Sequence, residues 1–396
     1  MLTQNLNWPK TATMKAIPYG KQHITQEDID AVVATLQSDY LTQGPAVAEF
    51  ENKFAEYIGC KYAVAVANGT AALHLCTLAL GVKAGDKVIT TPITFAASAN
   101  CVKYCGGDVV FEDIHDTSYL LDIDKVRALL QKYPKGTFKG IIPVDFAGQA
   151  LNLEAFKALA NEYNLWIIED ACHAPGGFFT DSKGQKQNCG NGNFADLAIF
   201  SFHPVKHIAT GEGGMITTNN EELYKKLLLL RTHGITKSPD LLIENHGAWY
   251  YEMQELGYNY RLSDMQAALG TSQLKRASEN LSKRKALVKR YDEAFLHLKE
   301  KITTPTHDKG HAFHLYIIQT EKRDELYKYL IANKIFAQVH YIPVHTMPYY
   351  KNLGWKNGDF PIAESYYKSC LSIPMYASLS FEDQDFVIQK ILDFFS

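Results

Sequence analysis

Two loops of this sequence carry the side chains that amine chemistry requires. Lys206 ends the segment S-F-H-P-V-K (Ser201 to Lys206), which lies between an apolar run and the glycine-rich turn Gly211 to Gly214. An amine enclosed there has a depressed pKa and is a good nucleophile, and the glycines let the backbone approach a flat ring. Asp170 follows another apolar run, and a carboxylate in that position keeps a neighbouring pyridine nitrogen protonated. Each has an ordinary alternative, because Lys206 could be a surface lysine and Asp170 a helix cap.

Two further loops offer groups that bind a phosphate and a ring. Asn68-Gly69-Thr70 precedes a stretch of helical pattern, and a helix N-terminus with a glycine and a hydroxyl is suited to a phosphate. A plain turn with an N-cap explains the same residues. Phe95 follows the run Lys87 to Thr90 and could stack on an aromatic ring, although a single Phe is also a common core residue. A phosphate cradle, a stacking ring, a carboxylate and an amine are together the parts of a pyridoxal-phosphate (PLP) site.

The elements that must position these loops read as an alternating α/β pattern from about residue 60 to 220. Short apolar runs are separated by stretches of helical length, which predicts a mostly parallel sheet buried on both faces, with ligands beyond the carboxyl ends of its strands. The predicted strands are Tyr62 to Ala67, Lys87 to Thr90, Val109 to Glu112, Gly140 to Val144, Leu165 to Glu169, Leu197 to Phe200 and Met215 to Thr218.

A change of pattern near Asp264 predicts a second, smaller α+β domain. We expect a long helix over Met265 to Leu298, a helix over Asp324 to Asn333, a strand over Ala337 to Tyr341 and a closing helix over Glu382 to Phe395. The resulting division is an N-terminal extension or mis-assigned start (residues 1–13), a large domain (14–264) and a small domain (265–396).

Composition excludes several classes of protein. The chain has 396 residues, 46% of them hydrophobic, and a formal net charge of -3 with both signs interspersed, so there is no basic stripe for nucleic acid or an anionic membrane surface. No run approaches the roughly 20 apolar residues of a membrane span, and no signal peptide is evident, so a cytoplasmic location is expected. Seven scattered cysteines predict reduced thiols, and no second Cys or His pair completes a metal site beside Cys101 and Cys105.

Several longer motifs together identify a family. They are L-T-Q-G-P (Leu41 to Pro45), N-G-T-A-A-L (Asn68 to Leu73), I-E-D-A-C-H-A (Ile168 to Ala174), S-F-H-P-V-K, G-E-G-G (Gly211 to Gly214) and N-Y-R-L-S-D (Asn259 to Asp264). In this order, from Tyr19 to the C-terminus, the chain resembles the sugar-nucleotide aminotransferases of the DegT/StrS type. The resemblance implies the fold type I architecture of PLP-dependent transferases.

The resemblance also implies roles for individual residues. Lys206 would hold PLP as a Schiff base and move protons, and Asp170 would pair with the ring nitrogen. Phe95 and His173 would flank the ring. The phosphate would be bound by Gly69, Thr70 and Ser201, with Asn259 reaching in from the partner of a homodimer that shares its active sites.

Three further motifs are P-Y-G (Pro18 to Gly20), D-Y-L-T-Q-G (Asp39 to Gly44) and V-H-Y-I-P-V-H (Val339 to His345). They resemble those of transaminases that act on a UDP-linked 4-keto-6-deoxy-N-acetylhexosamine on the pseudaminic acid pathway. The resemblance implies L-glutamate, converted to 2-oxoglutarate, as amino donor. The implied substrate-binding residues are Tyr19, Asp39, Tyr40, Leu41, Thr42, Thr70, Ser201, Val339, His340 and Tyr341. Transaminases for other nucleotide-linked keto sugars, such as dTDP-4-keto-6-deoxyhexoses, share much of this pattern.

Three other functions compete with this interpretation. PLP-dependent sugar dehydratases of the same family have a histidine where this chain has Lys206, which favours transamination. A non-enzymatic sensor that binds PLP would need an output domain, and no helix-turn-helix pattern is present. A nicotinamide dehydrogenase is excluded because the run Cys189 to Asn193 lacks the third glycine and a preceding strand.

Overall fold

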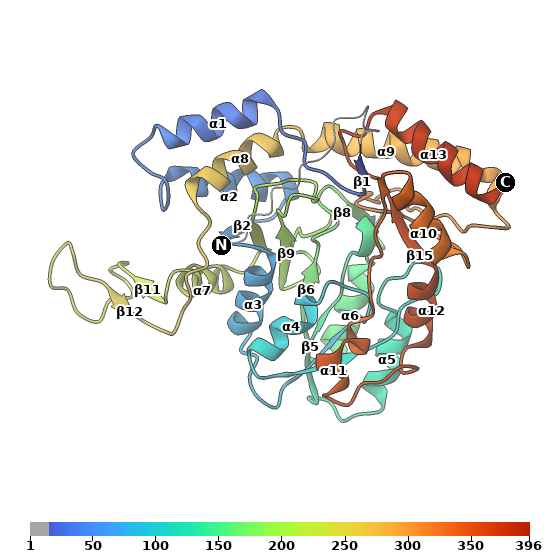
Figure 1. Cartoon of the computed structure of the whole chain (residues 1–396). Coiled ribbons are helices and arrows are strands. Elements are labelled where there is room, and N and C mark those ends of the chain that lie inside the picture. The colour runs from blue at the N-terminus through green and yellow to red at the C-terminus, as the bar shows by residue number, and fades with distance from the viewer. Residues whose placement is uncertain (1–15) are drawn as a thin grey trace, which may run out of the picture.

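The computed structural model describes residues 16–396 (Figure 1). The predicted extension over residues 1–13 lies outside the described residues.

A seven-stranded sheet forms the centre of the molecule, and each predicted strand coincides with one of its members. Its order is β2-β10-β9-β6-β5-β3-β4, in which β10 runs antiparallel to both neighbours and the other adjacent pairs are parallel. The strands are β2 (Tyr62–Val66), β3 (Lys87–Thr90), β4 (Asp108–Phe111), β5 (Phe138–Ile142), β6 (Trp166–Asp170), β9 (Leu197–Ser201) and β10 (Gly214–Thr218). The predicted mostly parallel architecture is confirmed.

Apolar side chains cover both faces of this sheet. Along β2, Val64 and Val66 join one hydrophobic cluster, whereas Ala63 and Ala65 join another. Successive residues of a strand point to opposite faces, so two separate layers pack on the sheet. The helices of this part are α2 (Pro45–Ile58), α3 (Gly69–Ala79), α4 (Ala97–Tyr104), α5 (Ile123–Gln131), α6 (Leu153–Tyr163) and α7 (Glu221–Arg231).

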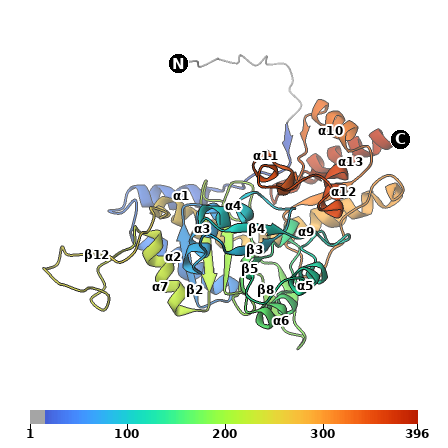
Figure 2. The same ribbon diagram turned by 90° about the horizontal axis from the view of Figure 1, so that it is seen from below.

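A small α+β unit lies beside the sheet, with its own core (Figure 2). Its strands pair as β1 (Ile17–Pro18) with β14 (Ile335–Phe336) and β13 (Tyr316–Gln319) with β15 (Cys370–Ile373). Ile17, far away in sequence, therefore belongs to the same core as the C-terminal residues. The helices here are α9 (Ala277–Ala294), α10 (Arg323–Ala332), α11 (Pro348–Lys351), α12 (Pro361–Ser369) and α13 (Phe381–Phe395).

Two predictions for this region were wrong in detail. The single helix over Met265 to Leu298 is divided into α8 (Asp264–Leu274) and α9, because α8 packs against α1 (Gln26–Leu36) and α2 while α9 packs in the small core. Arg276, at the break, binds Asp28 with 2.7 Å between Nη2 and Oδ2. The domain boundary predicted at residue 264 stays a prediction, because α8 follows that residue and still packs against α1 and α2.

The predicted strand Ala337 to Tyr341 is also absent. Strand β14 ends at Phe336, and beyond it Gln338 forms only an isolated bridge with Ser372. Side chains satisfy the backbone instead, since the Tyr366 hydroxyl donates to the His340 carbonyl over 2.8 Å. This irregular segment can therefore line a cavity.

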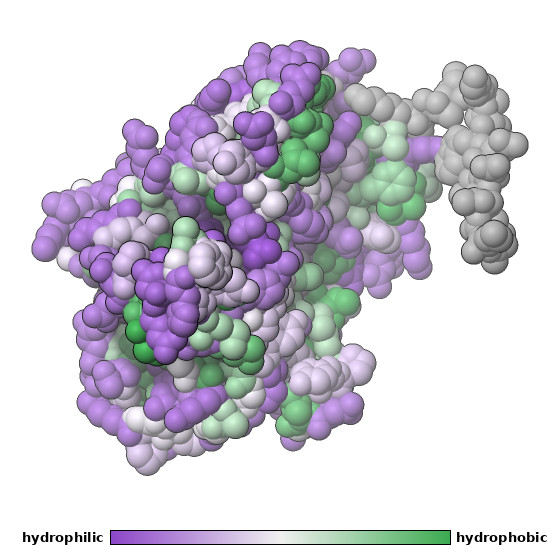
Figure 3. All heavy atoms as spheres, turned by 90° about the vertical axis from the view of Figure 1, so that its left-hand side faces the viewer, coloured by the Kyte–Doolittle hydropathy of each residue, from purple (hydrophilic) through white to green (hydrophobic). Residues whose placement is uncertain are grey.

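An arm projects from the sheet next to α7, as Figures 1 and 2 show. It carries the short pair β11 (Ile235–Thr236) and β12 (Glu252–Met253). Ile243, Trp249 and Leu256 on this arm are 86%, 73% and 77% exposed. Figure 3, which views the molecule from this side, shows hydrophobic atoms scattered among polar ones. Among the described helices none has the length and apolarity needed to cross a membrane.

Candidate active site

The four predicted loops meet at one cavity of about 710 Å³ beyond the carboxyl ends of β2, β6 and β9. Of the residues predicted for the cofactor, those that line it are Gly69, Thr70, Phe95, Asp170, His173, Ser201 and Lys206. Asn259 does not line this cavity and is exposed. One chain therefore brings together every predicted cofactor residue except the one expected from a partner.

Lys206 lies in the connection between β9 and β10. Its backbone N–H donates to the His203 carbonyl over 2.8 Å, which fixes the turn that carries it. Burial lowers the pKa of the Lys206 amine, while Cys172 and Asp170 nearby oppose that shift. A lysine with a lowered pKa is more often neutral, so this amine is suited to attack a carbonyl or to take a proton.

Asp170 is the last residue of β6 and is buried. Its Oδ2 accepts a hydrogen bond from Ser98 Oγ over 2.7 Å, and its Oδ1 accepts one from the Cys172 N–H over 3.2 Å. Ser98 Oγ is in turn 2.8 Å from Thr94 Oγ1. Two donors thus orient the carboxylate without neutralising it, which leaves it able to hold a protonated ring nitrogen.

His173 is a neutral imidazole of defined tautomer. Its Nδ1 accepts the Ala147 N–H over 3.2 Å, so the hydrogen is on Nε2, which lies 3.1 Å from the Tyr341 hydroxyl oxygen. Burial lowers the pKa of His173 well below its ordinary value, and the positive charge of Lys206 lowers it further. The Tyr341 ring is stacked at 24° to the imidazole. Two flat side chains therefore face a cavity that a flat cofactor would occupy.

The N-terminus of α3 forms the expected cradle. Asn68 caps the helix, its Oδ1 accepting the Ala71 N–H over 2.8 Å, so the first N–H groups, at Gly69 and Thr70, have no partner within the helix. A Cβ on Gly69 would lie 3.1 Å from the Ser201 Cβ. The absence of a side chain thus leaves room at a point where backbone donors and a hydroxyl converge, which fits a phosphate.

The residues predicted for the substrate divide into two groups. Tyr19, Val339, His340 and Tyr341 line the cavity, and the Tyr19 and His340 rings are 5.1 Å apart. By contrast Asp39, Tyr40, Leu41 and Thr42 are exposed and lie outside it. Thr42 pairs instead with Ser263, four residues from Asn259. The pairing of Thr42 with Ser263 therefore joins the segment Asp39 to Thr42 to the loop that contains Asn259. The roles of these residues stay predictions.

Other residues at the site escaped the sequence analysis. His314 lines the cavity with its ring 4.3 Å from that of His173, and Cys172 and Glu212 also line it. Nothing near His314 in the sequence indicates this position, because it comes from the small unit. Ser98 had a weak signal, since it follows Thr94 by four residues, Thr94 lying in the loop after β3 and Ser98 in the first turn of α4.

Comparison with known proteins agrees with this geometry. The sequence pattern of the DegT/DnrJ/EryC1/StrS aminotransferase family matches residues 22–392. Spore coat polysaccharide biosynthesis protein SpsC of Bacillus subtilis is 41% identical over 95% of this chain and 96% of its own. The UDP-4-amino-4,6-dideoxy-N-acetyl-beta-L-altrosamine transaminase of Campylobacter jejuni is also 41% identical, over 94% of this chain and 95% of its own.

A solved structure shares the fold and holds the expected cofactor. The PLP-form of Spr1654 from Streptococcus pneumoniae has a TM-score of 0.84 and 30% identity, over 95% of this chain and 97% of that one. The amine, carboxylate, neutral imidazole and helix N-terminus described above fit the same group. The chain therefore belongs to the DegT/DnrJ/EryC1/StrS aminotransferase family and is a PLP-dependent sugar aminotransferase.

Proposed function

We propose that this enzyme transfers the amino group of L-glutamate to C4 of a UDP-linked 4-keto-6-deoxy-N-acetylhexosamine, as a UDP-4-amino-4,6-dideoxy-N-acetyl-beta-L-altrosamine transaminase. The observation that carries the proposal is the position of Tyr19, Val339, His340 and Tyr341, which line the same cavity as Lys206. The similarity to the Campylobacter jejuni transaminase supports it. SpsC, a spore coat polysaccharide biosynthesis protein, is equally similar, and an assay with a panel of sugars distinguishes the substrates.

The phosphate and ring of the cofactor would be held by groups of this chain. The N–H groups of Gly69 and Thr70 and the Ser201 hydroxyl would bind the phosphate, where the positive end of α3 favours a dianion. The Asp170 carboxylate would accept a hydrogen bond from the ring nitrogen and keep it protonated. When bound, PLP supplies an aldehyde that condenses with amines and a ring that accepts an electron pair.

Proton movement would then fall to Lys206. Its Nζ, with a pKa lowered by burial, takes the proton from Cα of glutamate in the first half-reaction and gives a proton to C4 of the sugar in the second. His173 lies beside the ring as a neutral group, and its pKa shift keeps a competing positive charge away from Lys206. Tyr341 fixes the His173 ring through the 3.1 Å contact to Nε2.

We further propose that two copies form a homodimer with shared active sites in the cytoplasm. The support is that Asn259 and residues Asp39 to Thr42 are exposed and lie outside the cavity of their own chain. The pairing of Thr42 with Ser263 joins the two segments that carry them. The exposed apolar side chains of the arm would be covered in such an assembly.

The test is to incubate the purified holoenzyme with L-glutamate and a panel of UDP-, dTDP- and GDP-linked 4-keto-6-deoxy sugars. We expect 2-oxoglutarate and a 4-amino product mainly from the UDP-linked N-acetylated sugar, with Lys206→Ala as the inactive control. Preference for a dTDP or GDP sugar would refute the substrate while keeping the reaction. Loss of a sugar hydroxyl without gain of nitrogen would indicate a dehydratase and refute both.

A further inference from the structure

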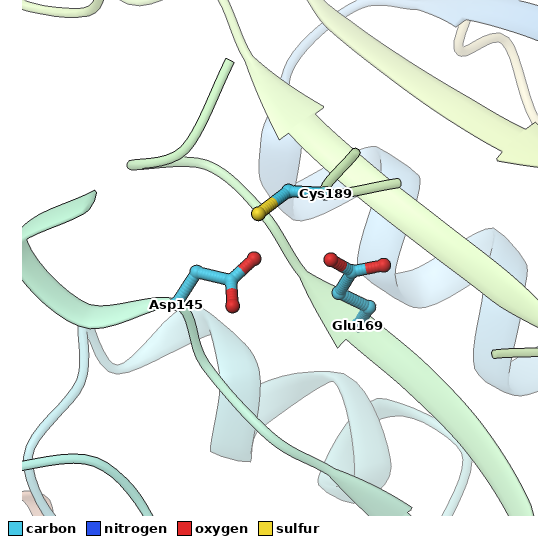
Figure 4. A group of neighbouring side chains, drawn as sticks. All are labelled: Asp145, Glu169 and Cys189. Atoms are coloured by element: carbon cyan, nitrogen blue, oxygen red, sulfur yellow. The ribbon is translucent and has the colours of Figure 1, made fainter. Parts of the chain in front are cut away.

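Three buried side chains outside the cavity converge behind the carboxyl end of β6. Asp145 follows β5, Glu169 lies on β6 next to Asp170, and Cys189 follows β8 (Lys186–Asn188). A carboxylate oxygen of each acid and the Cys189 sulfur all lie within 4.8 Å of one another. Figure 4 shows the two carboxyl groups pointing toward each other with the sulfur beside them. Glu169 and Asp170 are neighbours on one strand, so Glu169 faces away from the cavity that Asp170 lines.

One carboxyl oxygen of this group lacks a strong hydrogen-bond donor among the described residues. Both oxygens of Glu169 accept the Gly190 N–H, over 3.0 and 2.9 Å, and Asp145 Oδ1 accepts the Leu151 N–H over 2.9 Å. Asp145 Oδ2 is buried and accepts no N–H or O–H hydrogen bond from any described residue, and the Cys189 thiol beside the carboxyl group is only a weak donor. A buried acceptor in that position requires a donor, because leaving it unpaired is costly.

No positive charge balances the two acids. Neither takes part in any ion pair found among residues 16–396. The titratable groups that face them are Cys189, Asp170 and Cys172, none of which is basic. Burial raises the pKa of Asp145 and of Glu169, and the Asp145 charge raises that of Glu169 further. Two adjacent buried carboxylates cannot both stay ionised under these conditions.

The same group is connected to two residues of the active site. The Asp145 N–H donates to the Asp170 carbonyl over 3.0 Å. Asp145 also precedes the turn η1 (Phe146–Gly148), in which the Ala147 N–H donates to His173 Nδ1. Ala147 has a φ of 58°, a left-handed conformation that a residue with a side chain adopts only when its surroundings impose it.

We propose that Asp145 and Glu169 share a single proton, and that the resulting O–H···O bond is a positioning device that holds Asp170 and His173 at the cofactor cavity. The proton gives Asp145 Oδ2 a strong donor and leaves one negative charge on the pair. A metal ion in the same place is disfavoured by the Gly190 N–H, which points at both Glu169 oxygens, and by burial, which raises the pKa of Cys189 and keeps it a thiol.

Infrared difference spectroscopy of the holoenzyme tests the proton directly. At pH 7.5 we expect the carbonyl stretch of an un-ionised carboxylic acid in the parent, absent from both Glu169→Gln and Asp145→Asn, because an amide donor replaces the proton in each. Glu162→Gln, on the surface of α6, is the matched control and keeps the band. A band that persists in both variants, or a metal ion bound in equal amount to the protein, would overturn the proposal.

The pH dependence of unfolding gives a second, independent measure. The folded pair keeps a proton that the unfolded acids lose above their ordinary pKa, so the parent loses stability as the pH rises toward the pKa of the folded pair. Relative to Glu169→Gln, the unfolding equilibrium constant of the parent should increase with pH above the ordinary pKa of the acids, by up to about tenfold for each pH unit while the folded pair keeps its proton. A difference that does not change with pH would contradict a shared proton.

The positioning role predicts a contrast between two substitutions. Glu169→Gln keeps hydrogen-bonding groups facing Asp145 and Gly190, so its kcat should stay within about threefold of the parent. Glu169→Ala removes them, and its kcat should fall more than about tenfold, with recovery by Gln at the same position. If Glu169→Ala does not fold, the infrared result on Glu169→Gln still decides the proposal. Equal kcat for a folded Ala variant and the parent would refute the positioning role.

Discussion

Replacing Asp170 with Asn tests the part of the site that the structure defines best. The carboxylate is buried, with one oxygen bound to Ser98 Oγ at 2.7 Å and the other to the Cys172 N–H at 3.2 Å. Asn has nearly the same shape and keeps one oxygen acceptor, so the fold should persist. What disappears is the negative charge that, in the proposed mechanism, keeps the ring nitrogen protonated.

The size of the effect follows from the contact that is lost. A charge-assisted hydrogen bond in a water-poor site contributes about 2 to 4 kcal/mol to a transition state. This corresponds to a fall of roughly thirty- to a thousand-fold in rate. Ser98→Ala is a useful comparison, because it removes one donor and leaves the charge, and we expect it to lose less activity than Asp170→Asn.

The assay is the half-reaction with glutamate, followed through the cofactor absorbance in stopped flow, with circular dichroism to verify folding. The rate constant for proton removal should fall by the factor given above, with little change in glutamate affinity. A folded Asp170→Asn variant within threefold of the parent would show that Asp170 only supports the structure. A Ser98→Ala variant more damaging than Asp170→Asn would refute the reasoning in another way.

The remaining predictions concern the cofactor linkage, the assembly and the cradle. Borohydride should abolish the visible absorbance of the holoenzyme, and peptide mapping should place the label on Lys206; a label on another lysine contradicts the assignment. Co-refolding Lys206→Ala with Asn259→Ala, each nearly inactive, should give about half heterodimers and restore about a quarter of parental activity, because each heterodimer holds one intact site. No recovery despite verified subunit exchange would exclude a shared site. Gly69→Ala should weaken PLP binding about tenfold or more in equilibrium titration, since its Cβ would lie 3.1 Å from that of Ser201; unchanged affinity would show that the loop yields at no cost.

Sequence reasoning succeeded where local pattern and chain order determine structure. A run such as Leu197 to Phe200 can only be a buried strand in an alternating α/β chain, and β9 is found there. Once the strands are placed, their carboxyl ends share one edge, so the loops with Asp170 and Lys206 had to meet. Local rules were enough for this part of the site.

The rest depends on contacts between distant segments. His314 reaches the cavity only because the small unit packs beside the sheet, and no residue near it in the sequence carries that information. Glu169 has no signal in the sequence beyond its place in a strand, because its neighbour Asp145 comes from a different segment. Residues 337–341 alternate apolar and polar side chains as a half-buried strand does, but Ser372 and Tyr366 provide side-chain and bridge contacts in place of a regular ladder.

The reversed direction of β10 has a consequence for the role proposed for Lys206. Because β9 and β10 are antiparallel neighbours, Ser201 pairs with Gly214, and the whole connection that carries Lys206 starts and ends at the same point of the sheet. The Phe202 N–H bonded to the Gly213 carbonyl at 2.8 Å closes its base. The backbone at both ends of the connection is therefore fixed, and the Lys206 amine can change position only by rotations within its side chain of four methylenes. In its proposed role, Lys206 would therefore change between binding the cofactor and transferring protons without any rearrangement of the loop. Insertions into this connection should be tolerated far less than insertions into the exposed arm.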